Sequence, residues 1–274
     1  MRTALYVPGS SPRMIEKSRT LAVDVVIFDL EDAVSHCEKD AARGRVAEEL
    51  TREAPMTRWV RVNPVGSAEH VLDLKAILPA SPDAILLPMA DPESLAALDR
   101  YLDGAGGESN IPIVALVETA RGLLEVALLC QTSDRLIGLQ LGAEDLTAQL
   151  GVERTQGGEE IRFARHQLAL AAHAYGLMAI DTPNLRLGDD DDLRADIAIA
   201  RSSGMTAKTC IHPSQLAVVA EAFRPSETEI AWAERVLAAA DHAAEEGKGA
   251  VALDGQMIDA PVVARARRVL AAQN

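Results

Sequence analysis

A regular alternation of short apolar runs with longer amphipathic segments is the feature that most constrains the fold of this 274-residue chain. Each apolar run ends near Gly, Pro, Asn or an acid, and a stretch of helical period follows it. Eight runs are predicted as strands: residues 4–7, 25–30, 59–62, 84–87, 111–117, 136–141, 177–180 and 206–211. Apolar strands that alternate with helices indicate a parallel sheet covered on both faces.

The number of strand-helix units decides between two architectures. Helices are predicted between the strands, for example over residues 11–21, 38–51, 92–102, 121–130, 159–175 and 190–203. Eight βα units close a (β/α)8 TIM barrel. An open doubly wound sheet usually has fewer strands, and no GxGxxG motif follows the first strand here. The sequence therefore predicts a (β/α)8 barrel over residues 1–222.

Residues 223–274 exceed what a barrel requires and are predicted to form a C-terminal helical extension. Ser226 and Glu229 have the spacing of a capping box for a helix through about His242. Residues 245–249 are predicted as a linker, and a last helix follows Asp259 as its N-cap. Periodicity alone favours a passive helix pair on the barrel over the alternative, a lid or subunit-swapped arm over a site.

Charge and cysteine usage exclude several classes of function. Lys and Arg number 27 against 41 Asp and Glu, a net charge of −14 that repels phosphate backbones and anionic lipid. Neither nucleic acid nor membrane is an expected partner. Cys37, Cys130 and Cys210 form no CxxC pair, which argues against disulfides and a thiolate zinc site. With no signal or spanning segment predicted, we expect a cytoplasmic protein.

Polar residues follow the predicted strands at the edge where barrel enzymes build their active sites. The polar side chains are Asp29, Glu31, Asp32, Arg61, Asn63, Glu118, Glu144, Asp145, Asp181 and His212, and Gly142 and Ala143 lie at the same edge, after the sixth strand. Converging carboxylates repel each other unless a cation neutralises them. An oxygen-only ligand set without Cys or paired His indicates Mg²⁺, with Mn²⁺ as the alternative. Glu118 and Asp145, at the ends of adjacent strands, are the preferred ligands.

Several of these residues also have a structural explanation. Glu144 and Asp145 suit the first turn of a helix. Arg61 is placed to bind a carboxylate or a developing enolate, yet it could equally form a salt bridge to Glu31 or Asp29.

Lys208 and His212, in and after the last predicted strand, raise two further hypotheses. A buried barrel lysine invites Schiff-base chemistry, but an ion pair with an acid such as Asp181 is favoured for Lys208. His212 could be a base or a metal ligand, although a hydrogen-bonded structural role is the more common one for a single histidine.

Seven motifs run in series along nearly the whole chain. They are LYVPG at 5–9, DLEDAV at 29–34, VRVN at 60–63, ETARG at 118–122, GAEDL at 142–146, IHPSQ at 211–215 and GQMIDAP at 255–261. Any one of them alone is a weak signal, but their order and number are specific. Together they resemble the citrate lyase β-subunit (CitE-like) branch of the HpcH/HpaI aldolase superfamily.

That resemblance implies a (β/α)8 barrel, a Mg²⁺ ion and reversible carbon–carbon cleavage of a 3-hydroxy-acyl thioester. The products are a 2-oxo acid and an acetyl thioester. Glu118 and Asp145 match the family's metal ligands, and Arg61 matches the arginine that steadies the thioester enolate. The backbone amides of Gly142 and Ala143 would hold the carboxylate of the oxo acid.

The resemblance also implies roles for the remaining motifs. Glu31 and Asp32 would order metal-bound water, and Asp259 would act as acid and base in the site of a neighbouring subunit. This reverses the preference for a passive C-terminal helix pair, and it makes a homotrimer the expected assembly. The chain departs from the family at Met89, where many relatives carry Lys, so substrates that need another anionic contact are in doubt.

Four functions stay open at this point. The first is a free-standing lyase for malyl-, citramalyl- or citryl-CoA, and the second is the carrier-dependent citryl-ACP lyase subunit of a larger citrate lyase. The third is an acyl-CoA thioesterase, in which water attacks the same thioester. A catalytically silent acyl-CoA-binding subunit is the fourth, and the intact Arg61, Glu118, Asp145 and Asp259 argue against it.

Overall fold

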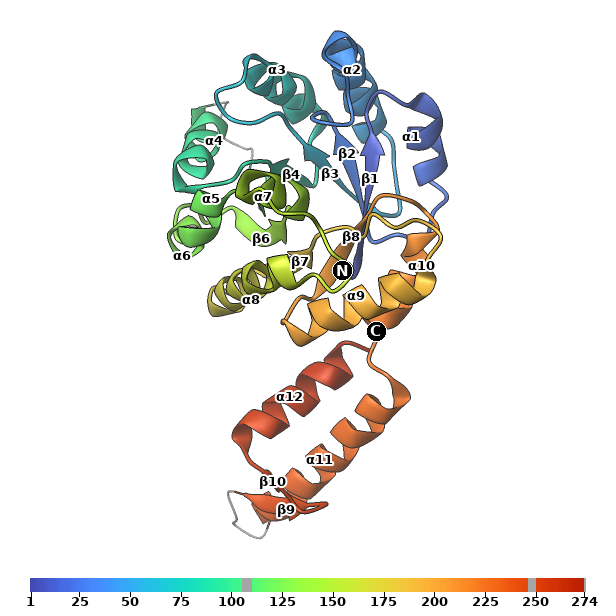
Figure 1. Ribbon diagram of the computed structural model, residues 1–274, viewed down its shortest axis with the longest axis vertical. Helices are drawn as coiled ribbons and strands as arrows, with labels where there is room; N and C mark the ends of the chain where they lie inside the picture. The colour runs from blue at the N-terminus through green and yellow to red at the C-terminus, as the bar shows by residue number, and fades with distance from the viewer. Residues whose placement is uncertain (105–109, 246–249, 274) are drawn as a thin grey trace. The chain divides into compact units, whose positions relative to one another are not determined.

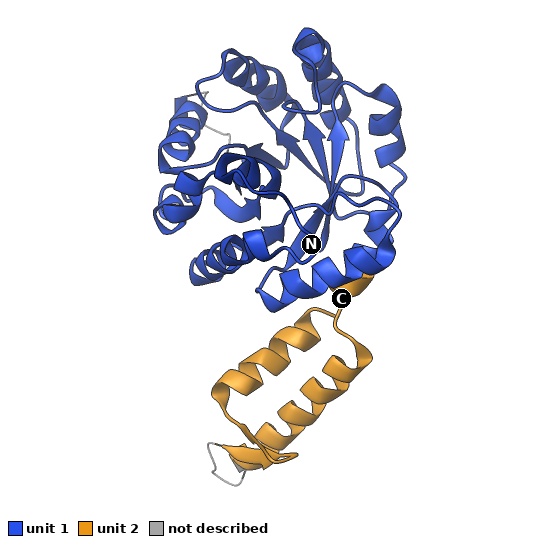
Figure 2. Cartoon of the chain, viewed as in Figure 1, with its two compact units in different colours: residues 1–220 blue, residues 221–274 orange. Residues whose placement is uncertain are grey.

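The computed structural model describes residues 1–104, 110–245 and 250–273 (Figure 1). The chain forms two compact units, the first ending at Ala220 and the second beginning at Glu221 (Figure 2). Within the described ranges, no helix is both long and apolar enough to span a bilayer.

The first unit is a closed barrel of eight parallel strands in sequence order. The strands are β1 (Thr3–Pro8), β2 (Val25–Asp29), β3 (Thr57–Arg61), β4 (Ala84–Leu87), β5 (Ile113–Val117), β6 (Leu136–Leu141), β7 (Met178–Asp181) and β8 (Ala207–Cys210). All eight predicted strands are present, and the predicted (β/α)8 barrel is confirmed. Inside it, apolar side chains such as Ile27, Trp59, Leu86 and Ile180 form one cluster. Each fully buried side chain of this kind stabilises the fold by about 1.5–3 kcal/mol.

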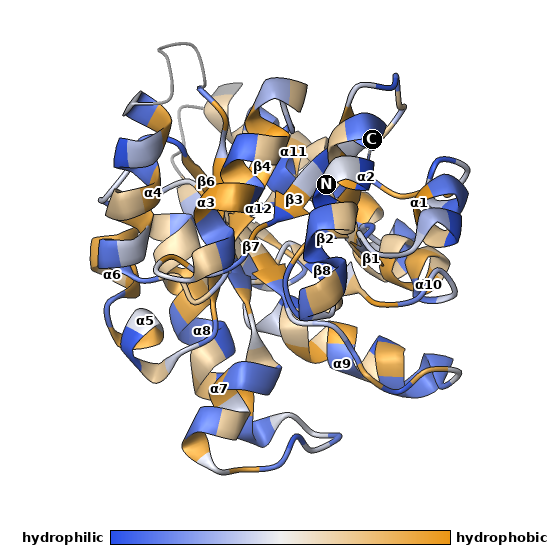
Figure 3. Cartoon of the chain, turned by 90° about the horizontal axis from the view of Figure 1, so that it is seen from above, coloured by the Kyte–Doolittle hydropathy of each residue, from blue (hydrophilic) through white to orange (hydrophobic). Residues whose placement is uncertain are grey.

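Helices follow the strands around the barrel. They are α1 (Pro12–Ser18), α2 (Lys39–Leu50), α3 (Ala68–Ile77), α4 (Pro92–Gly104), α5 (Ala120–Leu124), α6 (Val126–Leu129), α7 (Ala143–Leu150), α8 (Glu159–Ala174), α9 (Asp190–Ser202) and α10 (Gln215–Ala222). Figure 3 shows helices with hydrophilic and hydrophobic stretches alternating, as expected of helices with one face on the barrel. The single helix predicted over residues 121–130 is wrong in one respect, because Glu125, at φ −97° and ψ 9°, interrupts it.

The pairing register of the strands places three pairs of chemically important residues side by side. Arg61 lies opposite Asp29 in the β2–β3 ladder. Lys208 lies opposite Asp181 between β7 and β8. Val117 pairs with Leu141, so the residues that follow them, Glu118 and Gly142, also become neighbours.

The second unit consists of two helices and a short hairpin. The helices are α11 (Glu227–Glu245) and α12 (Ala260–Ala271), and the hairpin joins β9 (Val251–Leu253) to β10 (Gln256–Ile258). Its core contains Ala233, Val236, Ile258 and Ala266. The predicted linker at 245–249 falls, apart from its first residue, outside the described residues.

Both predicted caps of this unit are confirmed. Ser226 Oγ accepts from the Glu229 amide at 3.2 Å, and Glu229 Oε2 accepts from the Ser226 amide at 2.8 Å, which is a reciprocal capping box. Asp259 Oδ1 accepts from the Val262 amide at 3.3 Å at the start of α12. The hairpin was missed, although its Asp254-Gly255 turn has positive φ at both residues and is a strong hairpin signal.

Candidate functional site

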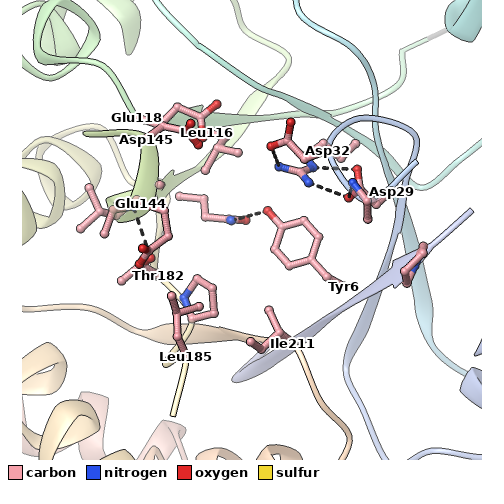
Figure 4. A pocket seen from close by; sticks show the side chains of 18 residues that line it. Tyr6, Asp29, Asp32, Leu116, Glu118, Glu144, Asp145, Thr182, Leu185 and Ile211 are labelled. Atoms are coloured by element: carbon pink, nitrogen blue, oxygen red, sulfur yellow. Dashed lines mark hydrogen bonds and ion pairs between the residues drawn. The ribbon is translucent and has the colours of Figure 1, made fainter. Parts of the chain in front are cut away.

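A cavity of about 420 Å³ lies at the carboxyl ends of the barrel strands (Figure 4). Its lining includes Tyr6, Asp29, Asp32, Arg61, Leu116, Glu118, Gln140, Gly142, Ala143, Glu144, Asp145, Thr182, Leu185 and Ile211. Figure 4 places Glu118 and Asp145 together, across the cavity from Asp29 and Asp32. The edge predicted from the sequence is therefore where the cavity forms.

Arg61 is held rigidly at this edge by acids from the neighbouring strand. Its Nε and Nη2 donate to the two carboxylate oxygens of Asp29 at 2.8 and 2.6 Å. Nη1 lies 2.8 Å from Glu31 Oε2, and the guanidinium carbon lies 5.0 Å from the centre of the Tyr6 ring. The ion pairs foreseen as a structural alternative are present, and they leave the guanidinium facing the cavity.

Glu118 is a buried carboxyl group that its surroundings hold in one orientation. Its Oε1 accepts from the Met89 backbone amide at 2.7 Å, and Met89 has a φ of 49° that side-chain-bearing residues rarely adopt. Burial raises the pKa of Glu118 to about 8, and the charges of Glu31 and Asp145 act in the same direction. The group is therefore mostly protonated at neutral pH until a cation binds beside it.

Gly142 leaves space beside this carboxyl group. A Cβ at residue 142 would lie 2.5 Å from Glu118 Oε2 and 3.1 Å from Leu116 Cδ1. Real Cβ contacts are longer than this, so any other residue would displace the Glu118 side chain. The cradle at Gly142 is filled by the Glu118 side chain itself, and it lets the carboxylate lie where it can meet a cation in the cavity.

Glu31 and Asp32 have different environments. Glu31 is buried against Arg61 and does not line the cavity, and burial raises its pKa to about 8 despite the opposing charge of Arg61. Asp32 lines the cavity with a side chain that is 70% exposed, 3.6 Å from Arg61 Nη1. Only Asp32 of the two is thus in direct reach of a molecule in the cavity.

Helix α7 begins at the cavity wall, and its N-terminal turn carries two of the predicted acids. Both line the cavity, but Glu144 is paired with Arg154 at 2.6 Å, whereas Asp145 lies beside Glu118. The Gly142 amide donates to the Val117 carbonyl at 3.0 Å, so it belongs to the barrel ladder. The Ala143 amide donates to Thr182 Oγ1 at 3.3 Å, a weaker bond that an anion at this helix end could replace.

Tyr6 and Gln140 line the cavity and were not predicted as site residues. Gln140 Nε2 lies 2.6 Å from the Tyr6 hydroxyl, a bond that crosses the barrel from β6 to β1. Gln140 is buried, and its Oε1 has no hydrogen-bond partner among the residues that the structure describes. The available signal was a lone glutamine in the apolar run of β6.

Lys208 is confirmed as an ion-paired residue. Its Nζ lies 2.5 Å from Asp181 Oδ2 and 2.7 Å from Asp196 Oδ2, and it donates to the Thr182 carbonyl at 2.7 Å. Arg165 binds the same two acids at 2.5–3.0 Å. An ammonium group enclosed in this way is not available for a Schiff base.

Two other predicted residues lie outside the cavity lining. His212 is exposed, and its Nδ1 bonds to Ser214 Oγ at 2.8 Å. Asp259 belongs to the second unit, where its carboxylate caps α12.

The oxygen ligands at the cavity fit a magnesium ion. Among the described residues, no group of three or more His, Cys, Asp or Glu side chains is arranged to hold a metal ion. Glu118 and Asp145 instead form a pair beside the cradle at Gly142. Mg²⁺ usually keeps several waters and takes one or two protein carboxylates, completing its octahedron with substrate oxygens.

Comparison with known proteins identifies the family. Residues 2–213 match the family model described as HpcH/HpaI aldolase/citrate lyase. The chain belongs to the HpcH/HpaI aldolase/citrate lyase family. Its similarity to members of this family extends over the second unit as well as the barrel, as the following relatives show.

Three relatives of the HpcH/HpaI family illustrate the range of activities. The chain is 34% identical to citrate lyase subunit beta of Leuconostoc mesenteroides, covering 100% of this chain and 93% of the relative. It is 37% identical to a (3S)-malyl-CoA thioesterase of Cereibacter sphaeroides, and the match covers 98% of this chain and 93% of the thioesterase. The crystal structure of CitE from Mycobacterium tuberculosis with magnesium, acetoacetate and coenzyme A superposes with a TM-score of 0.85 at 35% identity. The match covers 99% of this chain and 97% of the CitE chain.

Proposed function

We propose that this protein is a Mg²⁺-dependent carbon–carbon lyase that cleaves a 3-hydroxy-acyl-CoA to a 2-oxo acid and acetyl-CoA. The observation that carries the proposal is the convergence of Glu118, Asp145 and Arg61 on one cavity, two oxygen ligands facing a rigid guanidinium. The family membership, a relative that is a malyl-CoA thioesterase and a relative that binds magnesium, acetoacetate and coenzyme A support it.

The residues divide the work of bond cleavage. Mg²⁺ held by Glu118 and Asp145 would chelate the substrate's hydroxyl and carboxylate oxygens and lower the cost of the alkoxide. As the alkoxide becomes a carbonyl, the carbon–carbon bond breaks and its electron pair forms the thioester enolate. Arg61 stabilises the enolate oxygen, and the Ala143 amide at the start of α7 holds the carboxylate of the oxo acid. Asp259 accepts the proton that the hydroxyl group loses as the alkoxide forms and returns it to the enolate carbon, and in condensation the same proton moves in the opposite direction.

The acids after β2 support Arg61 and the metal. Asp29 and Glu31 fix the guanidinium from two sides, so that little reorganisation is needed when the enolate forms. Asp32, exposed in the cavity wall, would order water at the metal.

The decisive experiment is mass spectrometry of products after the protein is incubated with Mg²⁺ and malyl-, citramalyl- or citryl-CoA. Acetyl-CoA with a 2-oxo acid is the expected result. Free CoA with an intact hydroxy acid would instead make the protein a thioesterase, the second candidate, which the Cereibacter relative favours. Survival of every CoA ester, followed by cleavage of citryl-ACP, would make it a carrier-dependent lyase subunit.

Binding of Mg²⁺ is expected to release a proton at pH 7. Glu118, with a pKa raised to about 8 by burial, holds its proton at this pH and must lose it to bind a cation. Apparent affinity should therefore rise with pH, by about tenfold per unit, until pH 8. Isothermal titration calorimetry in two buffers of different ionisation enthalpy measures the released proton. Equal binding enthalpies in both buffers would contradict this assignment. The same titration of Glu31→Gln shows how much of the proton release comes from Glu31, whose pKa is also about 8.

Substituting Gly142 by alanine is expected to weaken Mg²⁺ binding by about tenfold or more, because the new methyl group occupies the space of Glu118 Oε2. Calorimetric titration of Mg²⁺ checks this. Gly44→Ala is the matched control, since Gly44 is inside α2 and a Cβ there meets no described atom within 4 Å apart from its chain neighbours and the backbone of its own helix. If both variants bind Mg²⁺ as the wild type does, the cradle has no role in metal binding.

We infer that Asp259 acts in the site of a neighbouring subunit of a homotrimer. Asp259→Asn and Asp145→Asn are each expected to be nearly inactive, whereas co-expression of the two chains should restore about a quarter of wild-type activity. With random assembly, three trimers in four are mixed and each mixed trimer has one site of three with an intact barrel and an intact Asp259, which makes about one site in four overall. Absence of recovery, with mixed trimers present in native mass spectra, would show that Asp259 does not act across subunits.

The cytoplasm is the proposed setting. The three cysteines are free thiols, as is usual for a reducing compartment.

A further inference from the structure

We propose that the protein prefers malyl and citramalyl thioesters over citryl thioester, because the described residues that line its cavity include no cation besides Arg61. The inference rests on the proposed lyase function and narrows its substrate. The carbon that bears the hydroxyl group carries hydrogen in a malyl, methyl in a citramalyl and a carboxymethyl group in a citryl thioester. The wall that faces this substituent decides which of the three is bound well.

The charges on the cavity wall are strongly unbalanced. Of the described residues that line the cavity, Arg61 is the sole cation. Carboxylates are contributed by Asp29, Asp32, Glu118, Glu144 and Asp145. A metal ion on Glu118 and Asp145 offsets two of these, and the substrate's own carboxylate is needed to complete its coordination. Asp29 is paired with Arg61, and Glu144 is paired with Arg154. Asp32, 3.6 Å from Arg61 Nη1, is therefore the wall carboxylate with the most distant countercharge, and a further substrate carboxylate would add to its charge.

Arg61 has little capacity left for such a group. Two of its five N–H bonds are taken by Asp29, at 2.8 and 2.6 Å, and Nη1 is 2.8 Å from Glu31. The bonds that stay free are those that the proposed function assigns to the thioester oxygen. A citryl carboxymethyl group would have to compete with the enolate for them.

Two barrel cations outside the cavity lining, Lys39 and Arg154, are also occupied. Lys39 Nζ donates to the carbonyls of Leu30 and Glu31 and to Asn63 Oδ1, at 2.7–3.0 Å, which uses all three of its protons. Arg154 is bonded to Glu144 at 2.6 Å. Neither side chain lines the cavity.

The rest of the wall suits an uncharged substituent. Leu116, Leu185 and Ile211 are apolar, and the Tyr6 and Gln140 side chains are neutral and bonded to each other. Hydrogen or methyl can be placed against such a surface at no electrostatic cost. A carboxylate there would lose hydration without gaining a partner, which is strongly unfavourable.

Calorimetric titration at saturating Mg²⁺ tests the inference directly. The probes are pyruvate, glyoxylate and freshly dissolved oxaloacetate, and the concentration of each free oxo acid is corrected for its complex with Mg²⁺. These are the oxo acids released from citramalyl, malyl and citryl thioesters. We expect oxaloacetate to bind at least about tenfold more weakly than pyruvate. Equal or tighter binding of oxaloacetate overturns the inference while leaving the lyase function intact. Failure of all three to bind, with every thioester uncleaved, removes the lyase function and this inference together.

A pair of variants on one loop tests the cause. Leu185 lines the cavity and is 49% exposed, so Leu185→Arg adds a cation at the rim without disturbing the core. It should reduce the difference between pyruvate and oxaloacetate by about fivefold, as expected of one added ion pair. Leu187→Arg is the matched control, since Leu187 is 55% exposed, two residues further along and outside the cavity lining. An unchanged ratio in Leu185→Arg would show that selection does not depend on the missing cation.

Discussion

Replacing Arg61 with lysine is expected to lower kcat/KM for thioester cleavage by about 10²-fold to 10³-fold, the range found when a donor to a developing oxyanion is removed. Lysine keeps the positive charge, but it has no planar fork to bind both oxygens of Asp29 and still face the cavity. The loss should fall mainly on kcat, because the enolate exists only along the reaction path. Steady-state kinetics at saturating Mg²⁺, together with thermal unfolding, measure it.

Arg58→Lys is the control for this substitution. Arg58 precedes Arg61 by three residues in β3, yet its Nη1 donates to the carbonyls of Glu49 and Arg52, away from the cavity lining. It should retain wild-type kinetics. A folded Arg61→Lys enzyme with unchanged kcat/KM would contradict the role of Arg61 at the enolate.

Asp145→Asn is expected to weaken Mg²⁺ binding by at least about 10²-fold and to abolish most of the lyase activity at physiological Mg²⁺. Mutating a residue that only orients a metal ligand lowers metal affinity by up to about 100-fold. Removing a carboxylate that binds the metal directly should lower it at least as much. Calorimetry gives the affinity, and rates at increasing Mg²⁺ show whether activity recovers. Such recovery would separate a binding defect from misfolding.

Glu144→Gln is the neighbour that makes this comparison informative. Both residues lie in the first turn of α7, but the Glu144 side chain is 44% exposed and paired with Arg154. Its replacement should change Mg²⁺ affinity by less than about twofold, since exposed ion pairs contribute little. If Glu144→Gln weakens binding as much as Asp145→Asn, the general negative charge of the helix end holds the ion, and Asp145 is not its specific ligand.

The architecture could be predicted because strand and helix signals recur with a period that only a few folds share. All eight apolar runs became strands, and the polar residues at or just after the ends of four of them contribute Asp29, Asp32, Arg61, Glu118, Glu144 and Asp145 to one cavity. The hairpin of the second unit was missed because its strands are three residues each, too short for an alternation to be visible. The break at Glu125 has no Gly or Pro to mark it.

The site was predictable in its composition but less so in its bonding. The sequence indicates that Arg61 and Glu118 lie at the same barrel edge. It does not show that Asp29 and the Met89 amide orient them, because these contacts depend on pairing register and loop geometry. The Gly142 amide, predicted to hold a carboxylate, is used by the barrel ladder, which transfers that role to Ala143 in our proposal. Tyr6 lines the cavity and bonds to Gln140, which is 134 residues away in the sequence, so local sequence patterns do not reveal this contact.

The enclosed ion cluster behind β7 and β8 constrains how this sequence can diverge. Arg165 and Lys208 balance Asp181 and Asp196, and all four side chains are nearly or fully buried. Neutralising one member leaves an uncompensated charge at a cost of about 3–5 kcal/mol, a large part of the roughly 5–15 kcal/mol by which domains are stable. Related sequences can therefore replace this charged cluster by apolar residues only through paired substitutions. The four positions should covary, although none of them lines the substrate cavity.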